Sequence, residues 1–385
     1  MIKILTFFYN STNYGGMLQA YALCRFLSIH NYKCEQICYS PTQSGKSSFI
    51  KKLKRLNIKK VFIKLHMLGN AMLFKLFCKN GNIRRQRFRD FQEQEVPHTT
   101  NVFTEKNLSL SVSSNDVIIV GSDQVWNPFW TNDNYFLDFV PSGCPKIAYA
   151  ASLGISSIPP ELFINRKKFL DRFHLISVRE KIAQQLLSVY TRARIHYVVD
   201  PTFLIKREQW DLLCQSPSIK EPYIFAYILG NNKNQKSLIK KIASLLNCKV
   251  VYIPHVHFLF NFNDLKIGDY NITDAGPKEF IGLIKNAEMV LTDSFHGCVF
   301  SIIYHKKFWA FNRHSANDKE NMNSRLDSLF STLKLQNRYI KSLNIQDLSI
   351  DYLQQPIDYV KVQSECDTFI KTSSSLLLNA IKDVE

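Results

Sequence analysis

The sequence predicts an α/β protein made of two doubly wound (Rossmann-like) αβα domains that face a cleft. Two observations support this prediction. Short apolar runs alternate with helical patterns, as in parallel sheets that are covered on both faces. The alternation stops after Asp200-Pro201 and then starts again. Because α/β sheets bind ligands beyond the carboxyl ends of their strands, two successive units imply a ligand cleft between them.

The first half opens with a strand–helix–strand unit, which is typical of a parallel sheet. The predicted strands are Ile2–Phe8, Cys34–Tyr39, Asp116–Val120, Lys146–Ala151, Leu175–Val178 and His196–Val199. The predicted helices run from Gly16 to about Ser28 and over Pro160–Leu170 and Glu180–Leu187. We assign residues 1–203 to this domain, with a basic insertion at 46–95.

The second half repeats the pattern over residues 204–350. Its predicted strands are Tyr223–Leu229, Lys249–Ile253, Met289–Thr292 and Phe308–Phe311. Its predicted helices are Arg207–Cys214, Asn234–Leu246, Pro277–Asn286 and Phe295–Tyr304. A last helix, about Val362–Ile381 within residues 351–385, is expected to pack back on the first domain.

Length and composition narrow the protein class. The chain has 385 residues, enough for two or three domains with substantial cores. We find no apolar run long enough for a spanning helix and no signal-peptide pattern at the N-terminus. Nine cysteines without a CxxC pair fit a reducing compartment. These features predict a cytoplasmic protein.

The net charge of +17 is concentrated in one segment. Between Lys46 and Arg89 there are fourteen Lys or Arg and no Asp or Glu. A basic apolar helix on an anionic membrane, a nucleic-acid patch and a solvated lysine-rich helix are the alternatives. Because no nucleic-acid module is evident, we expect no nucleic-acid partner and predict contact of residues 46–89 with a membrane, hence a peripheral location on its inner face.

Two strand ends in the first half carry candidate ligand-binding residues. Asn13, Tyr14, Gly15 and Gly16 lie where the first strand meets its helix, whose N-terminal N–H groups favour an anion. The alternative is an ordinary tight turn. Asp123, Gln124 and Asn127 follow the strand that ends at Val120 and resemble a sugar-binding loop. A capped turn with Trp126 buried is the alternative.

Two further strand ends carry candidate catalytic groups. Arg179 follows the strand Leu175–Val178 and is predicted to grip a phosphate or carboxylate with two N–H bonds. An interdomain salt bridge is the alternative. Asp293, Ser294 and His296 lie where the strand Met289–Thr292 meets a helix, and a histidine suits proton transfer near neutral pH. The alternative is a structural histidine.

Weaker candidates complete the set. Arg325 precedes an apolar helix and either starts that helix or reaches the cleft. Asp200 is interpreted as a cap rather than a base. His255 and His257 alternate on a probable strand, but no third ligand has convincing spacing, so no metal is predicted.

These motifs together resemble the polysaccharide pyruvyl transferase family. The segments that carry the resemblance are NYGGMLQAYAL, VGSDQVWNP, AYAASLG, SVRE, VVDPTFL, TDSFHG and NSRLDSLF. The resemblance implies a fold similar to GT-B glycosyltransferases. It also implies transfer of the pyruvyl unit of phosphoenolpyruvate to a sugar of a surface polysaccharide, or to its lipid-linked precursor, with formation of a pyruvate ketal and no cofactor. The acceptor would lie on the first domain and the donor on the second.

The resemblance implies roles for individual residues and shows one departure. His296 would be the acid/base, and Arg179 would bind the anion. In the family an Arg precedes the His by two positions, whereas this chain has Ser294 there. Arg325 or Arg313 would replace that cation, and we expect Arg325. The alternatives in function are a GT-B-type glycosyltransferase with a nucleotide-sugar donor and a non-catalytic glycan-binding protein.

Overall fold

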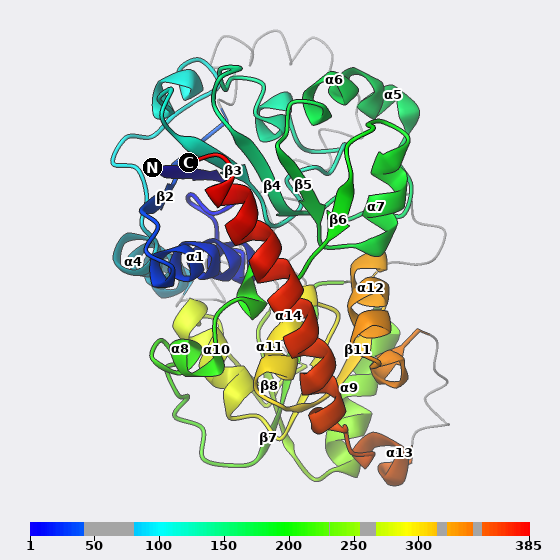
Figure 1. The fold of residues 1–385 in the computed structure, drawn as a ribbon. Coiled ribbons are helices and arrows are strands. Elements are labelled where there is room, and N and C mark those ends of the chain that lie inside the picture. Colours follow the sequence, from blue (N-terminus) through cyan, green and yellow to red (C-terminus); the bar gives the residue numbers. More distant parts are fainter. Residues whose placement is uncertain (42–80, 231, 255–266, 314–321, 342–348) are drawn as a thin grey trace, which may run out of the picture.

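The computed structural model describes residues 1–41, 81–230, 232–254, 267–313, 322–341 and 349–385. Over these residues the chain forms two six-stranded parallel sheets with helices on their faces (Figure 1). The doubly wound α/β fold predicted from the sequence is confirmed.

The first sheet has the strand order β2-β1-β3-β4-β5-β6. Its strands are β1 Ile2–Leu5, β2 Cys34–Gln36, β3 Val117–Val120, β4 Lys146–Ala151, β5 Leu175–Val178 and β6 Ile195–Tyr197. The helices of this half are α1 Tyr14–Ile29, α4 Gly81–Glu95, α5 Pro160–Phe163, α6 Lys167–Leu170 and α7 Lys181–Ser188. The chain order reverses between β1 and β3, which is where doubly wound sheets bind ligands.

The second sheet has the order β12-β11-β10-β7-β8-β9, which is the Rossmann order counted from β7. Its strands are β7 Tyr223–Tyr227, β8 Lys249–Tyr252, β9 Tyr270–Asn271, β10 Met289–Thr292, β11 Lys307–Phe311 and β12 Tyr339–Ile340. The helices of this half are α8 Arg207–Asp211, α9 Lys233–Leu245, α10 Pro277–Lys285, α11 Phe295–Ile303, α12 Ser324–Thr332, α13 Ile350–Gln354 and α14 Tyr359–Lys382. Its reversal point lies between β7 and β10.

Three details differ from the sequence prediction. Strands β9 and β12 have two residues each, too short for an alternating pattern to be recognised. Helix α4 lies in the segment interpreted only as a basic insertion. The single helix predicted over Pro160–Leu170 is broken by the 3-10 turn Ile164–Arg166. Arg166 in that turn donates to the Thr131 carbonyl and pairs with Asp133, which holds the turn against the neighbouring loop.

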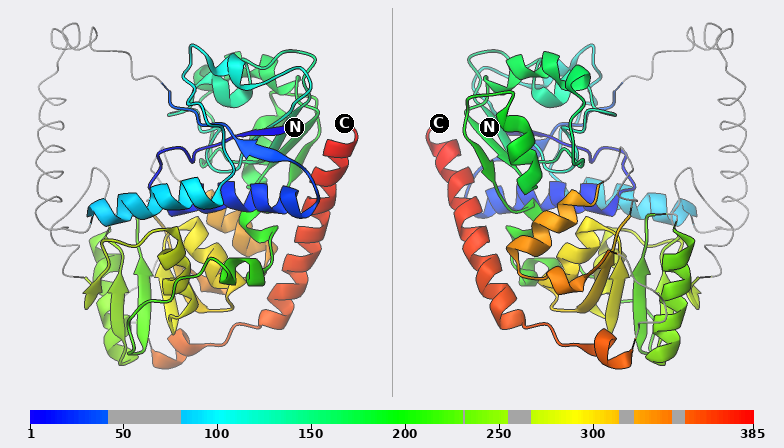
Figure 2. Two further views of the ribbon diagram at one scale, coloured as in Figure 1. Left: turned by 90° about the vertical axis from the view of Figure 1, so that its left-hand side faces the viewer. Right: turned by 90° about the vertical axis from the view of Figure 1, so that its right-hand side faces the viewer.

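The two halves share one continuous apolar interface. Helices α1 and α4 lie in a row along the boundary between the sheets (Figure 2). The Tyr14 ring at the start of α1 stacks on Phe280 of α10, with centroids 4.4 Å apart. Its hydroxyl donates to the Ala275 carbonyl at 2.7 Å. These contacts fix the start of α1, and therefore the loop before it, against the second domain.

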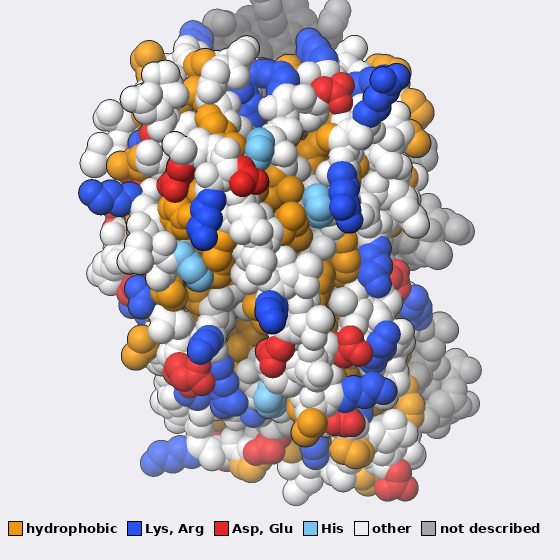
Figure 3. Space-filling model, in the orientation of Figure 1, with side chains coloured by type: hydrophobic (Ala, Val, Ile, Leu, Met, Phe, Trp, Pro, Cys, Tyr) orange, Lys and Arg blue, Asp and Glu red, His pale blue; other side chains and the backbone are white. Residues whose placement is uncertain are grey.

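Helix α14 runs along one side of both halves (Figure 1). Near its start, the Tyr359 hydroxyl donates to the Ser301 carbonyl in the second half. Further along, the Ser373 hydroxyl accepts from the Val199 N–H in the first half at 3.0 Å. Basic and acidic side chains are interspersed on the face that carries this helix (Figure 3). Among the described residues, no helix has the length and apolar character needed to cross a bilayer.

Candidate active site

Residues from both domains meet on one buried carboxylate, that of Asp200. Its Oδ2 accepts hydrogen bonds from Arg179 Nη1 at 2.6 Å and from Ser122 Oγ at 3.0 Å. The same oxygen lies 3.6 Å from His296 Nε2. Arg179 and Ser122 follow strands of the first sheet, whereas His296 lies on α11 of the second half. Asp200 therefore links the two domains at the base of the cleft.

The other carboxylate oxygen of Asp200, Oδ1, stabilises the local backbone. Oδ1 accepts from the N–H of Thr202 at 3.0 Å and from its hydroxyl at 2.7 Å, which caps the turn Pro201–Phe203. Burial alone would raise the pKa of the Asp200 carboxyl, but His296 and Arg179 outweigh it and hold that pKa well below its usual range. The interpretation of Asp200 as a cap describes only half of its contacts, because Oδ2 is the centre of the site.

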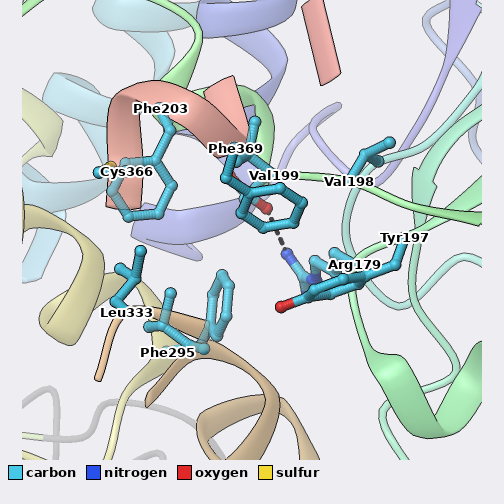
Figure 4. A pocket seen from close by; sticks show the side chains of 11 residues that line it. Arg179, Tyr197, Val198, Val199, Phe203, Phe295, Leu333, Cys366 and Phe369 are labelled. Carbon is cyan, nitrogen blue, oxygen red and sulfur yellow. Dashed lines mark hydrogen bonds and ion pairs between the residues drawn. The ribbon is translucent and has the colours of Figure 1, made fainter. Parts of the chain in front are cut away.

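Arg179 is completely buried and is already paired. Besides Asp200, its Nη2 donates to Asp123 Oδ1 at 3.2 Å, and its Nε lies 3.8 Å from Glu180. The guanidinium also lies 4.7 Å from the centre of the Phe295 ring. Figure 4 shows it closing one end of a small pocket lined by Phe295, Phe369 and other apolar side chains.

The predicted grip of Arg179 on the donor anion stays a prediction, and the structure shows which protein groups this side chain contacts. Both terminal nitrogens bond carboxylates, and the side chain has no exposed surface. Its Nε has no hydrogen-bond partner among the described residues. The pairing of Arg179 with Asp123 and Asp200 agrees more closely with the salt-bridge alternative.

His296 lies in the first turn of α11, packed against the start of α1. A methyl group added to Gly15 would lie 1.9 Å from His296 Nδ1, so only glycine allows this approach. Nε2 is buried and has no hydrogen-bond partner among the described residues. It faces Asp200, a carboxylate placed to stabilise positive charge on the imidazole. A histidine beside a buried carboxylate is an arrangement suited to proton transfer.

The side chains of Asp293 and Ser294 build the turn that carries His296. Asp293 accepts from the N–H groups of Leu229 at 2.8 Å and Gly230 at 2.7 Å, which joins the ends of β10 and β7. Ser294 Oγ caps α11 by accepting from the Gly297 N–H at 3.3 Å. Both were predicted to bind substrate, but the structure engages these side chains within the protein.

Two arginines of the second half lie above this turn. Arg313 donates to the Asp293 carbonyl at 3.2 Å. Arg325 is buried, and its only hydrogen bond among the described residues goes from Nε to the Met322 carbonyl. Burial, together with repulsion from Arg313 and Arg179, lowers the pKa of Arg325 to about 9. Glu180 and Asp123 act in the opposite direction, and no carboxylate among the described residues forms an ion pair with Arg325.

The loop after β3 contributes Ser122 and Asp123 to the cluster. Asp123 binds Arg179 and has a φ of 62°, so the backbone turns sharply there. Gln124 accepts from the Asn127 side chain at 3.4 Å, and Asn127 Oδ1 accepts from the Phe129 N–H. Trp126 is buried against Phe136. Gln124 and Asn127 thus stabilise the loop itself, as the capped-turn alternative expected.

The side chains of the turn between β1 and α1 make contacts within the protein, mostly at the domain interface. Asn13 caps α1 by accepting from the N–H groups of Gly15 and Gly16. Tyr14 is buried in the packing described above. A methyl group on Gly16 would lie 2.6 Å from the Phe7 carbonyl. The two glycines allow close packing within the protein, and Gly15 does so directly at His296.

Some sequence predictions fall outside the described residues. His255 and His257, the weak metal candidates, lie there, as do residues 46–80 of the basic segment. The remainder of that segment is in α4, where Arg87 pairs with Asp274 and Glu279. Among the described residues, no three His, Cys, Asp or Glu side chains gather as a metal site would require.

The fold and the site define a two-domain α/β enzyme of the GT-B-like architecture. A structure from Listeria monocytogenes described as a UDP-N-acetylglucosamine 2-epimerase has a TM-score of 0.51 at 9 % identity, covering 99 % of this chain and 95 % of that one. The UDP-GlcNAc 2-epimerase of Neisseria meningitidis has a TM-score of 0.48 at 10 % identity, covering 99 % of each chain. At 9 % identity, the Listeria monocytogenes match shows the fold alone.

Residues 13–315 match the family model of polysaccharide pyruvyl transferases. The chain therefore belongs to the polysaccharide pyruvyl transferase family and is a transferase. No curated protein sequence matches the chain. The matched range includes Arg179, Asp200 and His296, while Arg325 lies beyond it.

Proposed function

We propose that this enzyme transfers the pyruvyl unit of phosphoenolpyruvate to a sugar of a surface polysaccharide or its lipid-linked precursor, where it closes a ketal. The observation that carries the proposal is that Arg325 is buried and forms no ion pair with a carboxylate among the described residues. A buried cation without a carboxylate partner is costly unless an anion arrives with the substrate. Phosphoenolpyruvate has two anionic groups, and a site with two unsaturated guanidiniums suits it.

Arg325 and Arg313 are the proposed donor ligands. Arg325 replaces the cation that the family pattern places at position 294, where Ser294 instead caps α11. Arg313 approaches from the end of β11, and its Nε has no hydrogen-bond partner among the described residues. Together they would bind the phosphate and the carboxylate on the second-domain side of the cleft.

The proposed reaction needs one proton on carbon and one on phosphate. Protonation of the methylene carbon makes the central carbon electrophilic, and a sugar hydroxyl forms a bond to it. The C–O bond to phosphate breaks, and a second hydroxyl of the sugar closes the ketal. One hydroxyl proton replaces the proton given to the methyl group, and the other leaves with hydrogen phosphate. The protein needs no redox partner for this sequence.

His296 is the proposed acid/base, and Asp200 is its partner. The carboxylate would stabilise the imidazolium while it holds the proton, as buried carboxylates do for catalytic histidines. Arg179 fixes Asp200 and Asp123 in place. The acceptor would lie on the first-domain side near Asp123. Membrane contact through residues 46–89 at the inner face of the membrane is part of the proposal, as is the absence of a cofactor.

Calorimetric titration tests the donor assignment directly. We expect phosphoenolpyruvate to bind the wild-type protein, and Arg325→Gln to lose this binding. A panel of nucleotide sugars serves as the comparison, because a GT-B-type glycosyltransferase would bind one of them instead. Binding of a nucleotide sugar without phosphoenolpyruvate binding would overturn the donor. Glycan binding without any phosphate release would favour a non-catalytic protein.

A further inference from the structure

A second basic site lies at the cleft, outside the cluster around Asp200. A small open pocket is formed between the loop that precedes α1 and the outer face of α4, at the domain boundary shown in Figure 2. It is lined by Asn10, Ser11, Thr12, Arg85, Phe88, Arg89 and Gln92. The pocket combines two exposed arginines with hydroxyl and amide side chains.

The arginines on this face of α4 differ from Arg87 in their ion pairing. Among the described residues, no carboxylate pairs with Arg84, Arg85 or Arg89, whereas Arg87 on the same helix has two. Within the described part of the chain, the hydrogen bond of Arg89 goes to the Gln86 side chain. Four arginines in six residues would normally recruit acidic neighbours, because like charges on one helix repel each other. Arg84, Arg85 and Arg89 are therefore available to interact with an external anion.

Arg84 adds an independent observation. It is buried, and its guanidinium lies 4.8 Å from the centre of the Tyr14 ring and 5.8 Å from that of Phe88. Its Nε and Nη1 have no hydrogen-bond partner among the described residues. A buried cation directly behind Phe88 adds positive potential to the pocket that Phe88 lines.

The pocket lies near the reacting centre. Thr12 lines it, and Gly15, three residues later, contacts His296. Consecutive Cα atoms are about 3.8 Å apart, so this part of the chain spans at most about 11 Å. A short oligosaccharide covers such a distance. An anionic group in the pocket could therefore belong to the molecule whose sugar reaches His296.

We propose that Arg85 and Arg89, with the loop Asn10–Thr12, form a subsite for the diphosphate that carries the acceptor sugar. Arginine pairs match phosphate oxygens with two parallel N–H bonds, and adjacent phosphates suit two arginines one helical turn apart. Arg85 and Arg89 belong to α4 of the first half, whereas Arg313 and Arg325 belong to the second half. This inference rests on the proposed function for the identity of the sugar carrier, whereas the diphosphate chemistry rests on the pocket alone.

Calorimetry with inorganic pyrophosphate in the presence of saturating phosphoenolpyruvate tests the subsite. We expect pyrophosphate to bind under these conditions, because the two sites are separate. The exposed double variant Arg85→Gln/Arg89→Gln should weaken this binding at least about tenfold, the loss expected when charge-assisted hydrogen bonds are removed. Its affinity for phosphoenolpyruvate should not change. The matched control Arg192→Gln/Arg194→Gln, which removes two exposed arginines elsewhere, should leave both affinities unchanged.

Three outcomes would overturn the subsite. They are displacement of pyrophosphate by phosphoenolpyruvate, equal pyrophosphate binding by wild type and the double variant, and equal weakening by the control variant. If phosphoenolpyruvate does not bind the wild type at all, the proposed function fails. The comparison of pyrophosphate binding between the wild type and the double variant still tests the subsite.

Two diphosphate monoesters distinguish the source of the ligand. Farnesyl diphosphate in detergent represents a lipid carrier, and UDP represents a nucleotide carrier. Tighter binding of farnesyl diphosphate, lost in Arg85→Gln/Arg89→Gln, supports a lipid-linked acceptor. Tighter binding of UDP, lost in the same variant, supports a nucleotide-linked acceptor. Either result supports the subsite, and weak binding of both would contradict it.

Discussion

Arg179 and His296 belong to different domains, yet both face the same oxygen atom of Asp200, at 2.6 Å and 3.6 Å. A single buried carboxylate thus joins the cation of the first domain to the histidine of the second. The positions of these groups depend on each other, because moving either domain would separate the pair. Substitutions of Arg179, Asp200 and His296 are therefore expected to have different effects on turnover and on stability, rather than the same effect to different degrees.

His296→Asn should abolish turnover while the donor still binds. Asparagine keeps a polar group of similar reach but cannot transfer a proton at neutral pH. Loss of general acid–base catalysis typically costs about 10²–10⁴-fold in rate. Phosphate release under saturating phosphoenolpyruvate measures this loss, and calorimetry checks donor affinity. Near-normal turnover by this variant would remove His296 from the mechanism.

Arg179→Lys should lower kcat and thermal stability with little change in the affinity for phosphoenolpyruvate. A lysine ammonium is a single nitrogen and cannot reproduce the fork that reaches Asp123 and Asp200 from two nitrogens, so the pairing of at least one buried carboxylate is lost or weakened. Leaving a buried charge unpaired costs about 3–5 kcal/mol in comparable cases. Thermal unfolding and donor titration give the two readouts. A large loss of donor affinity with unchanged stability would return Arg179 to the role of anion ligand.

Arg325→Met should be at least as stable as the wild type when no anion is present. The substitution removes a buried charge that Arg313 and Arg179 repel, and methionine fills a similar volume. Stabilisation of the fold by phosphoenolpyruvate should disappear in this variant, because ligand stabilisation follows affinity for the native state. Melting temperatures with and without the ligand provide the test. A clear loss of stability in the ligand-free variant would show that Arg325 is structural.

Acid should destabilise the protein partly through Asp200. The pKa of this carboxyl is lowered in the folded state, so the folded state binds its proton less readily than the unfolded chain. The stabilisation is complete above the unfolded pKa of about 3.9 and is lost as pH falls further. Asp200→Asn should be less stable than the wild type at pH 7, with a difference that shrinks below about pH 4. A difference independent of pH would contradict this assignment.

The sequence predicts the strands and the motifs better than it predicts what each side chain contacts. Short apolar runs identify most strands, and the strand ends at Arg179 and His296 are in the site. Asn13, Ser294 and Asn127 were predicted to bind substrate, but cap or turn contacts use their side chains. A polar residue at a strand end has the same pattern in both roles, and only the three-dimensional contacts separate them.

Asp200 shows the opposite error, because the sequence analysis assigned this residue too small a role. Its place before Pro201 indicates a cap, and Oδ1 does cap the following turn. The task of Oδ2 depends on Ser122, Arg179 and His296, which are far away in the chain. Arg325 was a weak candidate at a helix start, and the absence of a cation at position 294 then favoured it as a donor ligand. The burial of Arg325 is what makes this residue informative, but no pattern in the sequence indicates that it is buried.

Mass spectrometry of the surface polysaccharide tests the central claim most directly. The material is compared from cells with the gene, without it, and without it but supplied with the wild-type or His296→Asn enzyme. We expect an increment of roughly 70 Da, the mass of a pyruvate ketal, that is lost with the gene and restored only by the wild-type enzyme. Persistence of the increment without the gene, or its restoration by His296→Asn, would contradict the account.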